Sequence, residues 1–204
     1  MNDFPSLFLA LVALAYWGRV GLMSFRIRRR TRTLAGVVPV QPLERALWLF
    51  FVPVVIAWIA IPWLAASREA GVWSIPPPLR SGPWLVVRFA AALAALALFA
   101  LTVRCWNRMG RHWKMAVTPG ERQVLITDGP FARVRHPIYG YQILLMLASL
   151  VAVPTTPMLI VAMVHLALMI IKAHNEERHL LGTHGDDYAR YIARTGRFFP
   201  RLSR

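Results

Sequence analysis

Two charged motifs frame a long apolar stretch in the C-terminal part of this chain. Arg135-His136-Pro137-Ile138-Tyr139 precedes the stretch, Glu176-Glu177 follows it, and residues 138–171 between them are mostly apolar. Pro154 and Pro157 divide the stretch, because proline cannot continue a helix and restricts the residue before it. The result is a helical hairpin, which brings its two ends together. We therefore expect cationic, aromatic and anionic side chains to meet at one face of a membrane.

These residue types suit a small charged ligand. Arginine binds a carboxylate through two parallel hydrogen bonds, and an aromatic ring attracts a cation to its face. Adjacent helical residues point about 100° apart. One of Glu176 and Glu177 can therefore face the ligand while the other meets an arginine such as Arg178 or Arg190. The alternative is a charged helix start at Arg135 that binds nothing.

The composition indicates an all-α membrane protein. The 204 residues are 57% hydrophobic, with a mean hydropathy of +0.47, which exceeds the apolar share of an ordinary soluble domain. Since about 20 apolar residues cross a bilayer, residues 4–25, 46–65 and 84–103 each predict one span. The stretch 138–171 predicts two, which gives about five transmembrane helices with a C-terminal helical hairpin and a short cytoplasmic tail. Each arm of the hairpin has only about 15 residues, so a full crossing needs tilt, local thinning of the bilayer or a snorkelling Lys172, and a re-entrant hairpin is the alternative.

Positive charge is unevenly distributed between the predicted spans. The net charge is +15, and most Lys and Arg residues fall in 24–45, 104–135 and 172–204. The positive-inside rule then puts the N-terminus outside and the C-terminus in the cytoplasm, with the inner membrane as the location in a bacterium. These charges flank apolar runs rather than covering a soluble face, so we expect no nucleic acid partner. The cluster at 26–32 either attracts anionic lipids or only sets the topology.

A few polar residues fall inside the predicted spans, and a few others could be metal ligands. Arg19 and Arg88 are expected to snorkel or to pair, and His165 to hydrogen-bond a neighbouring helix. His174, Glu177 and His179 are the metal-ligand candidate, but a helix that leaves a membrane often carries such residues, and we expect no metal. The sequence has no zinc, dinucleotide or P-loop signature, and its single cysteine allows no internal disulfide.

Three further motifs flank the two charged motifs, and together they resemble a known family. Residues 125–131 read Leu-Ile-Thr-Asp-Gly-Pro-Phe, residues 185–191 read Gly-Asp-Asp-Tyr-Ala-Arg-Tyr, and residues 197–200 read Arg-Phe-Phe-Pro. With the two charged motifs, residues 124–200 resemble the C-terminal catalytic region of the isoprenylcysteine carboxyl methyltransferase and phospholipid methyltransferase superfamily. The resemblance implies an integral-membrane enzyme that uses S-adenosylmethionine, with S-adenosylhomocysteine as the product. It divides the chain into a three-span N-terminal region, 1–123, and a catalytic region, 124–204.

The resemblance also nominates site residues. It implies catalytic roles for Arg135 and Glu177. It implies cofactor contacts from residues of both charged motifs and of the C-terminal tail: Arg135, His136, Pro137, Tyr139, Glu176, Glu177, Tyr188, Tyr191 and Arg197.

The acceptor is expected to be a lipid, or a lipidated small molecule or protein, from the bilayer. Carboxyl O-methylation is the leading reaction and phospholipid N-methylation the alternative. A carboxylate is already ionised at neutral pH and needs only orientation by Arg135, whereas an ammonium must first lose a proton to Glu177 or a histidine. Two further classes stay open, an NADPH-dependent sterol or enone reductase and a non-enzymatic scaffold or transporter. Transport fits less well, because the ionisable residues gather at one face rather than at the midplane.

Overall fold

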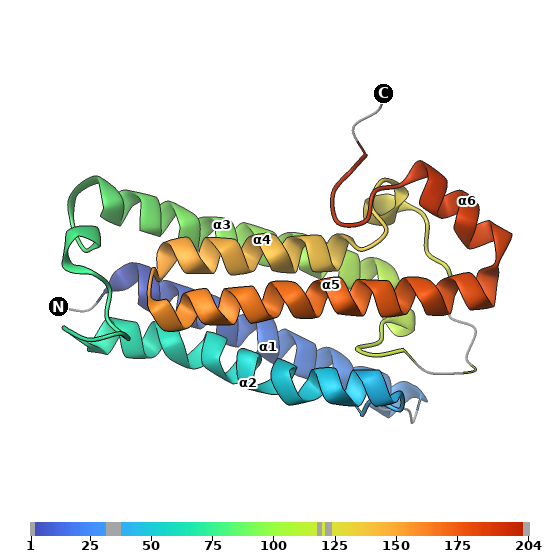
Figure 1. Cartoon of the computed structure of the whole chain (residues 1–204), viewed down its shortest axis with the longest axis horizontal. Coiled ribbons are helices and arrows are strands. Elements are labelled where there is room, and N and C mark those ends of the chain that lie inside the picture. Colours follow the sequence, from blue (N-terminus) through green and yellow to red (C-terminus); the bar gives the residue numbers. More distant parts are fainter. Residues whose placement is uncertain (1–2, 32–37, 118–119, 121–123, 202–204) are drawn as a thin grey trace.

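Six α-helices make up most of the computed structural model, which describes residues 3–31, 38–117, 120 and 124–201. Parts of the cluster 26–32 and the predicted boundary at 123 fall outside these ranges. The helices are α1 (Phe4–Thr31), α2 (Pro42–Ser67), α3 (Gly82–Met109), α4 (Pro137–Ala152), α5 (Thr156–His184) and α6 (Asp186–Arg194). Short 3-10 turns lie at Pro77–Leu79, Gly110–His112 and Gly129–Ala132. The described residues form no named strand, so the predicted all-α fold is confirmed (Figure 1).

Four helices are long and apolar enough to cross a membrane, namely α1, α2, α3 and α5. The fifth apolar helix, α4, has 16 residues and rises about 24 Å, so the short first arm of the hairpin is confirmed. The expectation of a short second arm is wrong, because α5 continues past residue 171 for a total of 29 residues. Residues 172–184 contain no proline and therefore extend the helix. It ends at Gly185, whose φ of 50° lies in the left-handed region that glycine tolerates.

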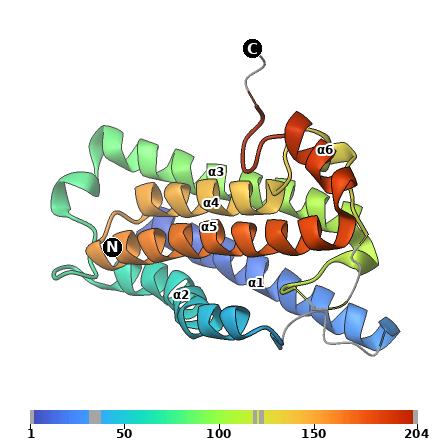
Figure 2. The same ribbon diagram turned by 45° about the vertical axis from the view of Figure 1, so that its right-hand side comes forward.

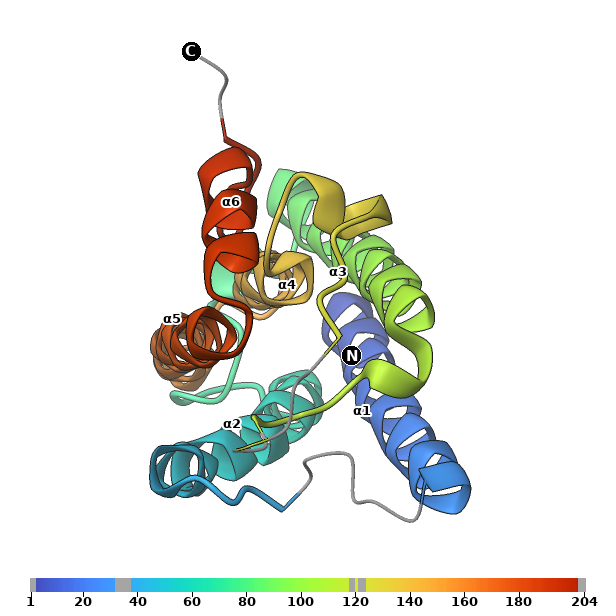
Figure 3. The same cartoon turned by 90° about the vertical axis from the view of Figure 1, so that its right-hand side faces the viewer.

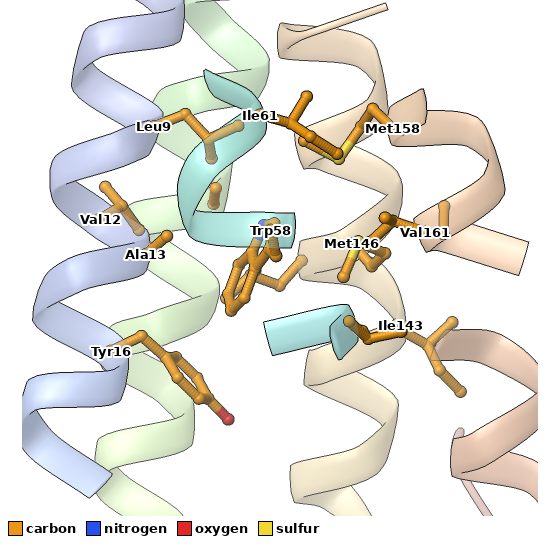
Figure 4. Close-up of a cluster of buried hydrophobic side chains, with 14 of the residues drawn as sticks. Leu9, Val12, Ala13, Tyr16, Trp58, Ile61, Ile143, Met146, Met158 and Val161 are labelled. Carbon is orange, nitrogen blue, oxygen red and sulfur yellow. The ribbon is translucent and has the colours of Figure 1, made fainter. Parts of the chain in front are cut away.

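The five apolar helices form a closed ring. Seen from the end in Figure 3, α1, α2, α5, α4 and α3 follow one another around the bundle, and each packs against the next. Tyr16 of α1 lies inside, with its ring centroid 5.6 Å from Trp58, 5.4 Å from Phe99 and 5.1 Å from Trp106. Figure 4 shows this interior, where aliphatic and methionine side chains of α1, α2, α4 and α5 face one another. Such a ring holds α4 between its neighbours and fixes where α4 begins.

Two of the charged residues predicted to snorkel or pair are buried or tied to other helices. Arg88 of α3 is 1% exposed and donates to Asp3 Oδ1 at 2.8 Å and to the Ala152 carbonyl at 2.9 Å. The predicted pairing is therefore confirmed, and it ties the N-terminal segment to the turn between α4 and α5. Arg19 donates to Asn107 Oδ1 at 3.2 Å.

Two other expectations are corrected. Lys172 does not snorkel. Its ammonium is buried and donates to Glu44 Oε2 and to the Met115 carbonyl, each at 2.9 Å. The predicted helix–helix hydrogen bond of His165 is also absent, since its buried Nε2 has no partner among the described residues. Hydropathy cannot reveal either outcome, because both depend on which side chains the ring places opposite them.

Candidate functional site

The predicted site residues converge at one end of the bundle. The start of α4, the end of α5, α6 and the loop that precedes α4 lie together there (Figures 1 and 2). This convergence follows from the antiparallel α4–α5 hairpin, as the sequence predicts. A cavity of about 750 Å³ opens between these elements. Seven of the predicted residues line it: Arg135, His136, Pro137, Tyr139, Glu176, Tyr188 and Tyr191.

Glu177 forms the centre of an ion-pair clamp next to this cavity. Its Oε1 accepts from Arg135 Nε at 2.9 Å, and its Oε2 accepts from an Arg197 guanidinium nitrogen at 2.7 Å. His136 Nε2 lies 3.3 Å from Oε1, without the geometry of a hydrogen bond. The Glu177 side chain is 8% exposed. The clamp therefore joins α5, the start of α4 and the C-terminal tail.

Glu176 faces the cavity instead. Its Oε1 accepts a hydrogen bond from the Tyr139 hydroxyl, and its Oε2 lies 3.6 Å from His136 Nδ1. The rings of His136 and Tyr139 stack, with centroids 5.5 Å apart and an angle of 7° between their planes. One glutamate thus faces the cavity and the other meets arginines, as predicted. The arginines are Arg135 and Arg197 and not Arg178 or Arg190; Arg190 pairs with Asp187.

The C-terminal tail pairs with the segment before α4. The backbone N–H groups of Arg135 and His136 donate to the carbonyls of Gly196 at 2.8 Å and Arg197 at 2.9 Å. The Gly196 N–H donates back to the Arg133 carbonyl at 3.0 Å. Close approach requires a glycine on α4, because a Cβ on Gly140 would lie 2.4 Å from the Phe198 carbonyl oxygen. The spacing of motifs gave no sign of this pairing, and Gly140 was not singled out from the sequence.

The two tyrosines of α6 differ in their hydrogen bonding. Tyr188 and Tyr191 are three residues apart, so they share one face of the helix. The Tyr191 hydroxyl donates to the Phe131 carbonyl at 2.5 Å, whereas the buried Tyr188 hydroxyl has no partner among the described residues. Burial raises the pKa of both phenols, that of Tyr191 to about 12. Both therefore stay protonated at neutral pH, and Tyr188 can donate to a ligand.

Other cavity residues were not predicted to be part of the site. Trp113 and Lys114, in the loop after α3, line the cavity together with Met109 and Leu180. A single sequence offers no signal for Trp113 and Lys114, because they lie far from the charged motifs along the chain. Leu125 and Ile126 also line it, and they belong to the flanking motif of residues 125–131.

The remaining nominated residues lie outside the cavity wall. Glu177 and Arg197 support the wall from behind through the clamp, so their direct contact with a cofactor stays a prediction. His174 contacts an Arg197 guanidinium nitrogen at 3.0 Å. Among the described residues, no group of three or more His, Cys, Asp or Glu side chains is placed to hold a metal ion.

Four helices long and apolar enough to span a membrane, with a cavity lined by charged and aromatic side chains at one end, fit an all-α membrane protein with a candidate site there. The model of the isoprenylcysteine carboxyl methyltransferase (ICMT) family matches residues 90–182, which run from α3 through α4 to near the end of α5. This match confirms the resemblance to that family of membrane methyltransferases. Tyr188, Tyr191 and Arg197 lie beyond the matched segment.

Two curated proteins are also similar in sequence. The chain is 27% identical over 121 residues to the nickel-cobalt-cadmium resistance protein NccN of Alcaligenes xylosoxydans xylosoxydans, which covers 59% of this chain and 55% of that protein. It is 31% identical over 96 residues to the cobalt-zinc-cadmium resistance protein CzcN of Cupriavidus metallidurans, which covers 47% of this chain and 44% of that protein. The alignments thus span about half the length of these relatives.

Proposed function

We propose that this chain is an integral-membrane methyltransferase that uses S-adenosylmethionine to methylate a lipophilic acceptor, most simply at a carboxylate. The observation that carries the proposal is the buried Tyr188 hydroxyl, which lines the cavity beside Glu176 and lacks a partner among the described residues. Buried polar groups are nearly always hydrogen-bonded, so a polar ligand in the cavity would complete this one. The ICMT family match supports the same class of reaction.

The donor set of the cavity fits this cofactor. Glu176 suits an ammonium group or ribose hydroxyls, and the aromatic rings of Tyr139 and Trp113 suit a flat base or a sulfonium cation. Arg135 uses Nε and one terminal nitrogen on protein partners, and its other terminal nitrogen can serve a carboxylate. When bound, S-adenosylmethionine supplies an electrophilic methyl group.

A second, smaller cavity adjoins the first and is the candidate place for the reacting head of the acceptor. It lies inside the ring of helices and shares Trp113 and Tyr139 with the first cavity. Trp17 Nε1 and Gln142 Oε1 belong to residues that line it, and both atoms are buried without a partner among the described residues. Tyr139 then lines both a donor side and an acceptor side. A direct displacement needs the two reactants aligned and in contact, and adjoining cavities with common wall residues would let them meet.

The clamp occupies Glu177, which leaves His136 as the base candidate for an amine acceptor, whereas a carboxylate acceptor needs no base. An amine must lose a proton before it can attack, but both oxygens of Glu177 are already bound to arginines. A carboxylate is ionised at neutral pH and needs no base. The indole N–H of Trp17 can donate to it.

We further infer that the site faces the cytoplasm. The described arginines Arg26, Arg104, Arg108, Arg111 and Arg133 belong to the segments at this end of the bundle, and retained positive charge marks the cytoplasmic side.

Isothermal titration of the detergent-purified protein tests the cofactor. S-adenosylhomocysteine should bind saturably, and NADPH should not. Tyr188→Phe removes only a hydroxyl that has no protein partner, so we expect it to weaken binding roughly fivefold without loss of folding. Arg190→Gln is the control, since Arg190 and its partner Asp187 are exposed and do not line the cavity. Binding of NADPH alone would reject the methyltransferase in favour of the reductase.

A further inference from the structure

A cationic groove lies between the ends of α1 and α3; it shares no lining residue with the proposed cofactor cavity and only Trp106 with the second cavity. It has a volume of about 730 Å³. Three arginines line it, Arg19 and Arg26 from α1 and Arg111 from the turn after α3. None of the three lines the proposed cofactor cavity. The groove is therefore a separate candidate site.

The described residues that line this groove are positively charged or uncharged, and none of them is Asp or Glu. Arg19 is held by Asn107, which accepts its hydrogen bond at 3.2 Å, while Arg26 and Arg111 are exposed. Three guanidinium groups around one groove repel one another, and an anion between them relieves that repulsion. Arginine also matches the geometry of phosphate oxygens.

The rest of the groove is apolar. Met23 and Ile27 are each 7% exposed, and Trp106 is 2% exposed. These side chains lie next to the arginines at the end of two membrane-spanning helices. A free phosphate ion would use only the cationic rim, whereas a lipid would place its phosphate on the arginines and its chain along the apolar wall.

We propose that this groove binds the phosphate group of an anionic membrane lipid. Arg26 and Arg111 supply most of the attraction from the exposed rim, and Arg19 is pre-positioned by Asn107. The basic stretch at the end of α1 thereby gains a specific role beyond setting the topology. The proposal does not rest on the proposed methyltransferase function, because its residues and its test are independent of the cofactor cavity.

Native mass spectrometry tests the groove, with the purified chain titrated by phosphatidylglycerol or phosphatidylcholine in detergent. Wild type should retain phosphatidylglycerol in preference to phosphatidylcholine. Arg26→Gln/Arg111→Gln should weaken the first phosphatidylglycerol site by ~10-fold or more, since each cation near an anionic lipid contributes about 1 kcal/mol. Both residues are exposed, and an unchanged thermal midpoint would show that the variant folds.

A charge-matched variant distinguishes the groove from general attraction. Arg28→Gln/Arg29→Gln removes the same charge from the same exposed helix end, but neither residue lines the groove, so it should stay within about twofold of wild type. Equal losses in the two double variants, or equal binding of phosphatidylcholine, would overturn the proposal. Displacement of the lipid by millimolar inorganic phosphate would assign the site to the free ion and reject the lipid.

Discussion

Glu177 accepts a hydrogen bond from Arg135 at 2.9 Å across 42 residues of sequence. This contact closes the α4–α5 hairpin at the site end, and Arg197 adds the C-terminal tail to the same carboxylate. The partly buried charges satisfy one another, so the geometry of the cavity wall depends on all three. Four predictions address this clamp and the elements around it.

Replacing the clamp carboxylate should destabilise the protein. Glu177→Gln keeps the shape of the side chain but leaves Arg135 and Arg197 without a charge partner. Loss of one member of a buried pair leaves an uncompensated charge, and we expect the free energy of unfolding to fall by about 3 kcal/mol. Thermal unfolding followed by tryptophan fluorescence measures the change. Asp187→Asn is the control, because its ion pair with Arg190 is exposed and should contribute less than about 1 kcal/mol.

Gly140 should be required for docking of the C-terminal tail. Gly140→Ala adds a Cβ that would lie 2.4 Å from the Phe198 carbonyl oxygen, so the tail must move away from α4. We expect trypsin to cleave after Arg197 or Arg201 faster than in wild type. The increase should be roughly tenfold if the free energy of local opening falls by about 1.4 kcal/mol. Gly182→Ala should not have this effect, since a Cβ there meets nothing within 4 Å. Equal cleavage of all three proteins would contradict the role of Gly140.

Replacing both partners of the buried ion pair between Lys172 and Glu44 should destabilise the protein less than replacing Lys172 alone. Glu44 is 0% exposed and also accepts from Asn175 at 2.8 Å. Lys172→Met alone leaves a buried carboxylate and should cost about 3 kcal/mol. Adding Glu44→Met should recover a large part of that loss, because two apolar side chains replace the ion pair. The thermal midpoints of the two single variants and the double variant measure the coupling, and additive losses would refute it.

Stability should fall at alkaline pH through the α6 tyrosines. The folded pKa of Tyr191 is raised to about 12 by burial, above an ordinary value of 10.0. Below pH 10 the phenol is protonated in both the folded and the unfolded state. As the pH rises from 10 toward 12 the unfolded state ionises first, so the free energy of unfolding falls. The slope of the unfolding free energy over this window should be shallower in Tyr191→Phe than in wild type. The same slope in both proteins would mean that the Tyr191 phenol ionises equally in the folded and unfolded states.

The sequence was sufficient to predict the five apolar helices and the end of the bundle at which the candidate site lies. Hydropathy located the spans, and the two prolines located the hairpin turn, because both signals are local. The meeting of Arg135 with Glu177 followed from the hairpin alone. The angle between adjacent residues on a helix also predicted that one of Glu176 and Glu177 would face the cavity while the other paired with arginine.

Other features depend on tertiary placement. The length of α5 was underestimated, because its polar final turns continue the helix after the apolar signal ends. Snorkelling of Lys172 was one way considered for a short arm to cross the bilayer, but Glu44 lies opposite Lys172 in the ring and pairs with it. The tail pairs with residues 133–136 through backbone N–H and carbonyl groups. Most residue types carry both groups, so the side-chain sequence gives no sign of this pairing. Trp113 joins the cavity from a loop, where no periodic pattern exists.

The short length of α4 sets the depth of the proposed site. From a shared turn at the far end, α4 rises about 24 Å and α5 about 43 Å, against a hydrocarbon layer of about 30 Å. With the shared turn at the far edge of the hydrocarbon layer, the start of α4 and its cavity would lie just inside the near edge, while α5 would continue toward the water. A lipophilic molecule can present its polar end there while its chain remains dissolved in the bilayer, so no energy is needed to lift it out.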